Sequence, residues 1–243
     1  STLANALVLA GGTLKGTNGF GESWSGNISL NAMSIVDVGY SMTLSGNISG
    51  AGMLSKAGAG VLNLSGSNSY TGGTQLNAGT VALGSATALG SSGTIGFGGG
   101  TLRFSATNTT DYSARFGTTS GQAYRLDTNG QDISLSANLG SSGGSLNKLG
   151  AGTLTLRGAA TYNGATIVSD GQLVIRNNLL QLGTSGISGA GRLVLEPVAD
   201  SFSAPSTTFT TPIQGLSGLV IGKGGNTAGL NLTGTVNVAG PIS

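Results

Sequence analysis

The stretch that decides the fold is KAGAGVLNLSGSNSYTGGTQLNAGTVALG, Lys56 to Gly84. It is rich in glycine, nearly free of charge, and places apolar residues two positions apart in Leu62-Asn63-Leu64 and Val81-Ala82-Leu83. A period of two over about four to six residues, broken by Gly, Asn or Ser, is typical of short β-strands. Each such strand has one apolar face that it cannot bury alone. The stretch therefore predicts β-strands that stack on other segments of the chain.

The pattern returns 92 residues later in KLGAGTLTLRGAATYNGATIVSDGQLVIR, Lys148 to Arg176. Lys, Gly, Leu, Tyr and Thr keep their spacing in the pairs Lys56/Lys148, Gly58/Gly150, Leu62/Leu154, Leu64/Leu156, Tyr70/Tyr162, Thr74/Thr166 and Gly79/Gly171. A third, diverged copy has Lys223 at the lysine position and Leu230 and Leu232 at the leucine positions. We expect one domain over residues 1–243, built from super-repeats of about 90 residues that cover roughly 1–88, 89–180 and, in part, 181–243.

Repeated short strands joined by glycine turns predict an all-β fold in which successive turns of chain stack as a parallel β-solenoid. At roughly 20–25 residues per coil, the chain would form about ten or eleven coils. A β-sandwich is the main alternative, but it expects clearer hairpin signals than the dipeptides Asn18-Gly19 and Asn129-Gly130. Two stretches, 105–132 with its cluster of charges and 196–212 with three of the four prolines, are expected to be excursions from the solenoid.

Composition narrows the function. Only 7% of residues are charged, and the chain has no Cys and no His. These absences exclude disulfides, thiolate and His-based zinc sites, and a Ser-His-Asp triad. The ten basic and eight acidic residues are scattered singly, so we expect no nucleic-acid partner. The longest apolar run, about Ala6 to Ala10, is too short for a transmembrane segment.

The best acidic cluster is Asp127-Thr-Asn129-Gly130-Gln-Asp132, which superficially resembles a calcium loop. Asn138 stands where the glutamate at the twelfth position is expected. We interpret the cluster as a turn in which Asx side chains bond to their own backbone, with a weak calcium site as the alternative. No catalytic, cofactor-binding or metal-binding residue is assigned, and the protein is expected not to be an enzyme.

Three further features have structural interpretations. The recurring Lys56 and Lys148 are expected over the mouth of a coil or at its edge, where they would discourage wrong pairing. The recurring Tyr70 and Tyr162 are expected to pack a coil corner rather than to stack on a sugar. Trp24, the sole tryptophan, is expected to be buried under a loop rather than to form a sugar platform.

The run G-A-G-x-L-x-L-x-G-x-x-x-Y-x-G-x-T followed by A-G-T-V-x-L-G, at Gly58 to Gly84 and in altered form at Gly150 to Arg176, resembles the passenger-associated transport repeat. The resemblance implies a right-handed parallel β-helix within an exported autotransporter passenger. It also implies an extracellular or outer-surface location, most commonly on a Gram-negative bacterium. The sequence contains neither the signal sequence nor the C-terminal membrane barrel of that architecture. It is therefore expected to be a piece of a passenger or a separately released subunit.

These observations together predict a non-enzymatic structural protein that acts as a stiff spacer, an adhesive, or a filament subunit that stacks end to end with itself. For assembly, we assign Leu3, Leu7, Leu9, Leu14, Leu230, Leu232, Val236 and Val238. The alternative is an adhesin that binds a host-surface or glycan ligand through loops, for which the contact residues would be Asp111, Arg115, Arg125, Phe202 and Phe209. A third, enzymatic alternative is a polysaccharide lyase or hydrolase, which would need Asp111, Asp127 or Asp132 to converge with Arg115 or Arg125.

Overall fold

A computed structural model describes residues 2–16, 21–177, 182, 184–198, 206–222 and 229–243 of the chain. In this part of the chain the regular structure is β-strand, apart from one short 3-10 helix, η1 (Ser113–Arg115). The chain divides into two compact units. Unit 1 contains Ser1–Thr110 and Arg115–Gly117, and unit 2 contains Asp111–Ala114 and Thr118–Ser243. The single domain expected from the sequence stays a prediction.

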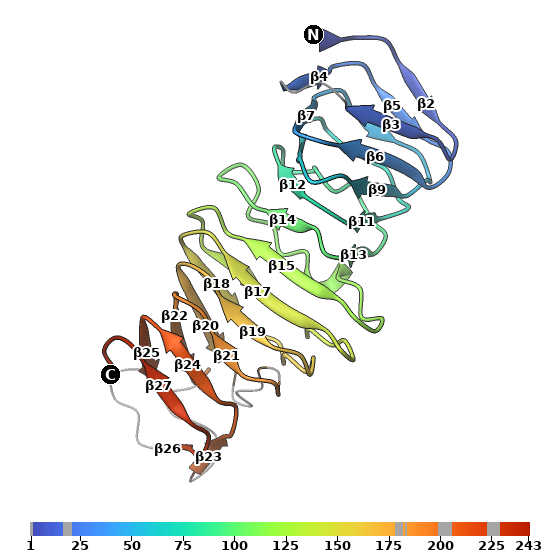
Figure 1. Ribbon diagram of the computed structural model, residues 1–243. Coiled ribbons are helices and arrows are strands. Elements are labelled where there is room, and N and C mark those ends of the chain that lie inside the picture. The colour runs from blue at the N-terminus through green and yellow to red at the C-terminus, as the bar shows by residue number, and fades with distance from the viewer. Residues whose placement is uncertain (1, 17–20, 178–181, 183, 199–205, 223–228) are drawn as a thin grey trace. The chain divides into compact units, whose positions relative to one another are not determined.

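Unit 1 has three sheets, and every pairing between its strands is parallel (Figure 1). In order of pairing, the first sheet contains β1 (Thr2–Leu3), β4 (Glu22–Trp24), β7 (Ser41–Leu44), β10 (Val61–Leu64), β12 (Thr80–Leu83) and β14 (Thr101–Arg103). The second contains β3 (Thr13–Gly16), β6 (Ser34–Val38), β9 (Leu54–Ala57), β11 (Thr74–Leu76) and β13 (Ile95–Phe97). The third contains β2 (Leu7–Leu9), β5 (Ile28–Leu30) and β8 (Ile48–Ser49).

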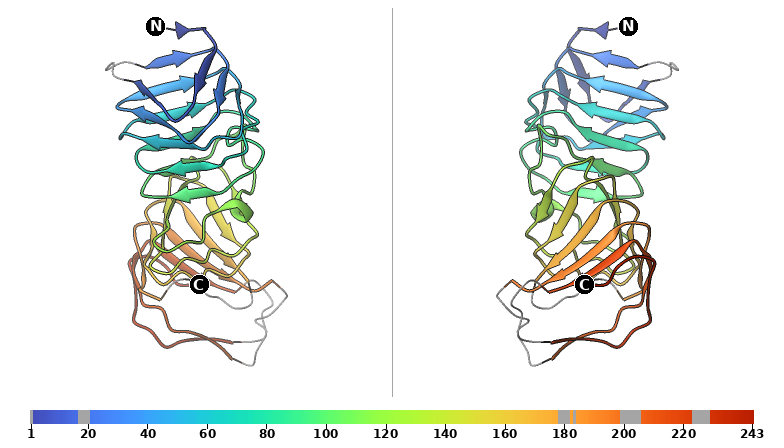
Figure 2. Two further views of the ribbon diagram at one scale, coloured as in Figure 1. Left: turned by 90° about the vertical axis from the view of Figure 1, so that its right-hand side faces the viewer. Right: turned by 90° about the vertical axis from the view of Figure 1, so that its left-hand side faces the viewer.

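Unit 2 repeats the arrangement, again with parallel pairing (Figure 2). Its first set of strands is β15 (Ala123–Asp127), β17 (Ser145–Leu149), β19 (Thr166–Val168), β21 (Ile187–Ser188), β24 (Ile213–Leu216) and β27 (Val236–Val238). Its second sheet is β16 (Ile133–Leu135), β18 (Thr153–Leu156), β20 (Gln172–Arg176), β22 (Arg192–Glu196) and β25 (Gly218–Ile221). A separate two-stranded sheet pairs β23 (Ser206–Phe209) with β26 (Gly229–Leu232).

The pairing register shows that each strand stacks on the strand one turn of chain away. Leu62 pairs with Met42 in the preceding coil and with Val81 in the following coil, 20 and 19 residues away. In unit 2, Leu154 pairs in the same way with Ile133 and Leu173. The predicted all-β parallel β-solenoid is therefore confirmed, with about 10 turns. The coils are at the short end of the expected length.

Ladders of aliphatic side chains fill the interior. Stacking in register places an inward-facing residue of one coil directly against the inward-facing residue of the next. The resulting columns, each member no more than 4% exposed, are Met42, Leu62, Val81 and Leu102 in unit 1 and Ile133, Leu154, Leu173, Leu193 and Leu219 in unit 2. Full burial of such a side chain contributes about 1.5–3 kcal/mol. These columns therefore contribute to the favourable free energy of folding.

Glycine occupies the coil corners where backbones come closest. A Cβ atom at Gly46 would lie 2.0 Å from the carbonyl oxygen of Gly26, and one at Gly66 would lie 2.1 Å from that of Gly46. These three glycines recur every 20 residues and stack directly on one another. Here glycine is needed because no side chain fits, and not because of its backbone angles.

The two predicted excursions differ in the structure. Only part of 105–132 leaves the stack, since β15 pairs with β17 and buries Tyr124 and Leu126 completely. The alternating apolar residues of Ala123–Asp127 explain why this charged segment still forms a strand. In 196–212, residues 199–205 lie outside the described part, and β23 pairs only with β26 among the described strands.

Replacing Gly46 with Ala should destabilise the protein by about 2–3 kcal/mol, because the new methyl group forces two stacked corners apart. Gly12→Ala is the matched control, since a Cβ at Gly12 would have no atom within 4 Å. Urea unfolding followed by circular dichroism measures both changes. Equal stabilities of the two variants would contradict the close backbone contact at this corner.

Candidate functional site

The repeated lysines lie inside the solenoid. Lys56 in β9 and Lys148 in β17 are both 0% exposed, so the prediction that they sit over the mouth or at the edge of a coil is wrong. The physical reason is the strand alternation, which puts Lys56 on the same inward face as Leu54, and Lys148 on that of Leu146. The repeat therefore carries an ammonium group into a largely apolar core.

Each lysine is held by backbone carbonyl oxygens of the turns around it. The Nζ of Lys56 donates to the carbonyl oxygens of Ala57 at 2.6 Å, Gly58 at 2.7 Å and Ala78 at 3.3 Å. The Nζ of Lys148 donates in the same way to Leu149 at 3.2 Å, Gly150, and Asp170 at 3.1 Å. Two of the three acceptors belong to the turn after the lysine, and the third lies in the next coil. One side chain thus ties two successive coils together.

Burial lowers the pKa of both lysines. Desolvation brings the pKa of Lys56 from its usual 10.5 to about 8, and the carboxylate of Asp37 in the preceding coil opposes this only in part. Burial likewise lowers the pKa of Lys148, against the attraction of Asp170 and Asp127. Hydrogen bonds stabilise the ammonium form of the lysine in this position. Protonating the buried amine nevertheless costs more free energy than protonating a lysine in water.

The repeated tyrosines pack the interior beside the lysine turns. Tyr70 and Tyr162 are 0% and 1% exposed, which confirms that they are packing residues and not sugar platforms. The hydroxyl of Tyr70 lies 2.7 Å from Oγ1 of Thr74, and that of Tyr162 lies 2.6 Å from Oγ1 of Thr166. Each copy of the repeat therefore satisfies its buried phenol with its own threonine four residues on.

The calcium-like cluster is a turn, as expected. Oδ1 of Asp127 accepts a hydrogen bond from the backbone N–H of Asn129 at 2.9 Å. Asn129 and Gly130 adopt positive φ angles of 50° and 82°. Asp132 accepts from the backbone N–H of Thr153 in the next coil. Among the described residues, no three His, Cys, Asp or Glu side chains gather in a way that could hold a metal ion.

The charged residues predicted as partner contacts make internal hydrogen bonds. The guanidinium of Arg115 donates to the carbonyl oxygens of Leu89, Gly90, Ser92 and Gly93 within unit 1. Within unit 2, the carboxylate of Asp111 accepts from the N–H and hydroxyl groups of both Ser113 and Ser136. These hydrogen bonds hold the pKa of Asp111 below its usual range even though burial opposes the shift. Arg125 is half-buried in β15.

Two of the residues predicted to contact a partner, Phe202 and Phe209, are outside the described residues or described without their side chains. Phe202 lies outside the described residues, and Phe209 is in β23, where the description covers the backbone alone. Their role as partner contacts stays a prediction, as does that of Asp111, Arg115 and Arg125.

The residues predicted for assembly lie in strands at the edges of their sheets. Strand β1 contains Leu3, β2 contains Leu7 and Leu9, and β3 contains Leu14. Each of these strands has a partner strand on one side only among the described residues. Val236 and Val238 belong to β27, which pairs with β24. Leu230 and Leu232 belong to β26. This placement is compatible with assembly, which stays a prediction.

Trp24 lies in strand β4, and its burial under a loop stays a prediction. It lines a cavity of about 130 Å³ together with Leu3, Leu14, Lys15, Glu22, Ser23 and Met42. Its indole Nε1 is buried and has no hydrogen-bond partner among the described residues. The interior near β1 is therefore less completely packed than the aliphatic columns farther along unit 1.

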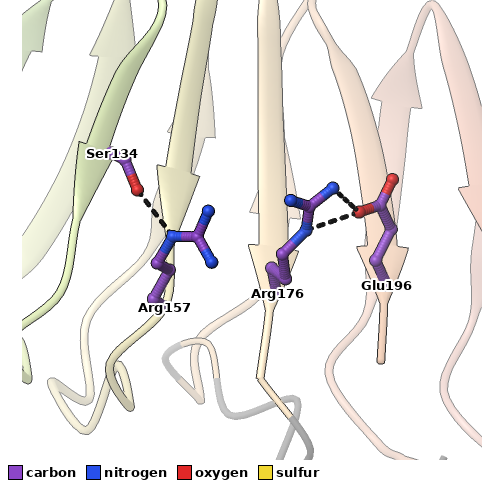
Figure 3. Close-up of polar contacts among 4 residues, drawn as sticks. All are labelled: Ser134, Arg157, Arg176 and Glu196. Atoms are coloured by element: carbon purple, nitrogen blue, oxygen red, sulfur yellow. Dashed lines mark hydrogen bonds and ion pairs between the residues drawn. The ribbon is translucent and has the colours of Figure 1, made fainter. Parts of the chain in front are cut away.

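A row of charged side chains that was not predicted from the sequence lies on the outer face of unit 2. Arg157 directly follows β18, one position beyond the pair Leu156–Ile175, so it stands beside Arg176 at the end of β20. Arg176 pairs in register with Glu196, and its Nε and Nη2 donate to Oε2 of Glu196 at 2.8 and 2.5 Å. Nε of Arg157 donates to Oγ of Ser134 at 2.9 Å (Figure 3). The spacing of these residues, 19 and 20 positions, matches the coil length and was the available signal.

The fold and the repeated interior motif define the class of this chain, a β-solenoid assembled from Lys-Gly-Tyr-Thr repeats. The family model described as Passenger-associated-transport-repeat matches residues 54–83 and 146–175, which contain the two buried lysines and their tyrosine–threonine pairs. The chain therefore contains two passenger-associated-transport-repeats, as the sequence motif predicted.

A second comparison finds a relative among curated proteins. The chain is 35% identical over 154 residues to the adhesin BmaC autotransporter of Brucella suis biovar 1 (strain 1330). The match covers 62% of this chain and 4% of the relative. The chain thus spans a small part of the length of that protein. No solved structure matches the chain.

Replacing Lys56 with Met should leave three partly buried carbonyl oxygens without the lysine donor. Each unpaired acceptor costs about 1–3 kcal/mol, which exceeds what is regained by removing a desolvated charge, so we expect a loss of about 2 kcal/mol or more in the free energy of unfolding. Lys15→Met is the control, because the Lys15 side chain is 63% exposed. Urea titration at pH 7 measures both. A loss no larger than that of the control would show that the three hydrogen bonds do not stabilise the fold.

The lowered pKa of Lys56 makes stability depend on pH. The unfolded chain binds this proton more tightly than the folded one, so the free energy of unfolding should rise as pH increases from about 8 towards 10.5. The linkage contributes at most ~3 kcal/mol.

Burial raises the pKa of Tyr124 from 10.0 to about 12, so ionisation of this tyrosine in the unfolded chain should reduce stability above pH 10. Urea midpoints between pH 7 and 11 should pass through a maximum, and the rise should be smaller in Lys56→Met.

Proposed function

We propose that this chain is a non-enzymatic structural segment of an autotransporter passenger, displayed on the surface of a Gram-negative bacterium or released from it, where it serves as a stiff spacer. The observation that carries this proposal is that the polar side chains of the interior form hydrogen bonds within the solenoid itself. Both buried lysines and both repeat tyrosines bond to the solenoid itself, to backbone carbonyls or to a neighbouring threonine. Lysine and tyrosine can act as catalytic groups in enzymes, but here their polar atoms form hydrogen bonds that hold the coils together.

The arrangement of the charged residues supports a non-enzymatic role. A lyase or hydrolase would need a carboxylate and a basic group to converge in a groove. Instead, Arg115 is engaged by four backbone carbonyls of unit 1, while Asp111 is engaged by two serines of unit 2. Asp127 and Asp132 each accept a hydrogen bond from the backbone. These contacts give each group a structural role in its own turn.

The comparisons support the surface location. Passenger-associated-transport-repeats occupy 54–83 and 146–175, and the curated relative is an adhesin autotransporter. In the proposal, the segment is one part of a much longer adhesive protein and holds other parts away from the cell. None of the helices among the described residues has the length and apolar character needed to cross a membrane.

End-to-end stacking is a second candidate function, favoured by the strands at the start of unit 1. β1, β2 and β3 each have an unpaired edge among the described strands, and Trp24, whose indole N–H has no partner among the described residues, lines the nearby cavity. A further coil, from a neighbouring part of the same polypeptide or from a second copy, could continue all three sheets. Negative-stain electron microscopy at rising protein concentration separates these cases.

We expect the spacer to remain as isolated particles whose stacked coils resist proteinase K under native conditions. Filaments would favour self-assembly instead. In that case Leu7→Asp, which places a charge on the half-buried inward side of β2, should abolish them, whereas Val8→Asp on the same strand, at a residue that is 62% exposed, should not. Rapid proteolysis of the unassembled chain to small peptides would contradict the spacer proposal.

A further inference from the structure

The outer face of unit 2 carries two arginines that point toward each other from neighbouring strands. Figure 3 shows the terminal nitrogens of Arg157 turned toward Arg176, and one terminal nitrogen of Arg176 turned back toward Arg157. The two side chains are anchored on their outer flanks, Arg157 by Ser134 and Arg176 by Glu196. Because adjacent strands are about 4.8 Å apart, the guanidinium groups border a common space.

Several donors that face this space have no hydrogen-bond partner among the described residues. Only Nε of Arg157 has a hydrogen bond among the described residues, so both of its terminal nitrogens are free of partners there. Arg176 uses Nε and Nη2 for Glu196, which leaves Nη1. Arg157 is exposed, and the side chain of Arg176 is 41% exposed, so a ligand can reach these groups from solvent. The anchoring contacts hold the donors in place before any ligand arrives.

The positive charge at this position is concentrated between the two arginines, and the carboxylates of Glu196 and Asp111 lie on the outer flanks. Two guanidinium groups at neighbouring register positions repel each other, and Glu196 forms an ion pair with Arg176. Asp111 lies against Ser136, the residue beside Arg157 on the other side, but its carboxylate is engaged by the hydroxyl and N–H groups of Ser113 and Ser136. An oxyanion between the arginines would relieve the repulsion and accept several charge-assisted hydrogen bonds.

We propose that Arg157 and Arg176 form a binding site for the sulfate or carboxylate groups of an acidic polysaccharide. Arginine suits this task because its planar fork binds two oxygens of one oxyanion. The outward positions around the pair are Ser134, Thr153, Thr155 and Gln172, which are polar, and the valines Val174 and Val194. No aromatic residue occupies an outward position of β16, β18, β20, β22 or β25, so the face lacks the stacking platform that single-stranded nucleic acids use.

The site extends the proposed spacer function by adding a ligand, yet it depends only on the fold of unit 2. The test uses the whole 243-residue chain and a fluorescent, size-defined heparin oligosaccharide, with affinity measured by fluorescence anisotropy. Arg157→Gln should weaken binding about tenfold, since the exposed side chain supplies most of the free donors. Urea midpoints of every variant report folding separately, so a failure of the fold is not mistaken for a failure of binding.

Arg192→Gln is the matched control. Arg192 is exposed on the same sheet, but its register neighbours are Gln172 and Gly218, so it has no second arginine beside it. We expect this variant to lose less than about threefold in affinity, because only diffuse charge is removed. Equal losses in Arg157→Gln and Arg192→Gln would overturn the paired site in favour of general charge attraction.

A variant that should strengthen heparin binding tests the same geometry. Glu196→Gln keeps an oxygen that can accept from Arg176 but removes the negative charge that repels an anionic ligand, so it should tighten heparin binding by about twofold to fivefold. Asp132→Asn alters the net charge equally at a carboxylate that bonds to the Thr153 N–H, and it should have a smaller effect. No difference between the two variants would contradict direct binding at Arg176.

Three further probes fix the class of ligand. An oligogalacturonate that competes with heparin and is also sensitive to Arg157→Gln would support recognition of oxyanions on a polysaccharide. Single-stranded DNA of the same charge that binds as tightly, with the same sensitivity, would overturn the choice of polysaccharide. Inorganic sulfate that binds while the oligosaccharide does not would show a site for a free anion only and would also overturn the proposal.

Discussion

Stacking each coil on the next in parallel register is the constraint on which this structure depends. Because neighbouring strands lie about 4.8 Å apart, every residue of a coil has a counterpart at the same distance above and below it. The aliphatic columns meet this requirement by placing like against like. The corners meet it by removing the side chain, as at Gly46, where a Cβ would overlap the carbonyl oxygen of Gly26. Both solutions follow from one spacing.

The turns pose a harder problem, because they direct backbone carbonyl oxygens into the interior, away from water. Leaving them unpaired would be costly. Lys56 and Lys148 solve the problem with a side chain long enough to reach the turn after it and the coil beyond. The lysine then has to give up much of its own hydration, which lowers its pKa. The Lys, Tyr and Thr positions of the repeat are thus explained by one requirement, the pairing of polar groups that stacking buries.

Much of this fold could be predicted from the sequence, since the period of two, the glycine turns and the duplicated segment all report local geometry. The location of Lys56 was missed because a charged residue was assigned to the surface, although the alternation from Leu54 places it inward. Arg157 and Arg176 were missed for another reason. Their proximity depends on the register between two strands, and a coil length uncertain by a few residues cannot place 157 against 176.

Inward-facing and outward-facing side chains of the solenoid are under different constraints. Inward positions are fixed by neighbours above and below, so almost any change there disturbs three coils at once. Outward positions such as Arg157, Arg176 and Glu196 form columns with the same spacing but without the packing requirement. A few substitutions on such a column can create a linear array of donors or acceptors while the core stays as it is. A ligand that is itself a linear polymer suits such an array, because both present regularly spaced groups along one direction. A recognition surface can therefore arise on a spacer without a dedicated binding domain.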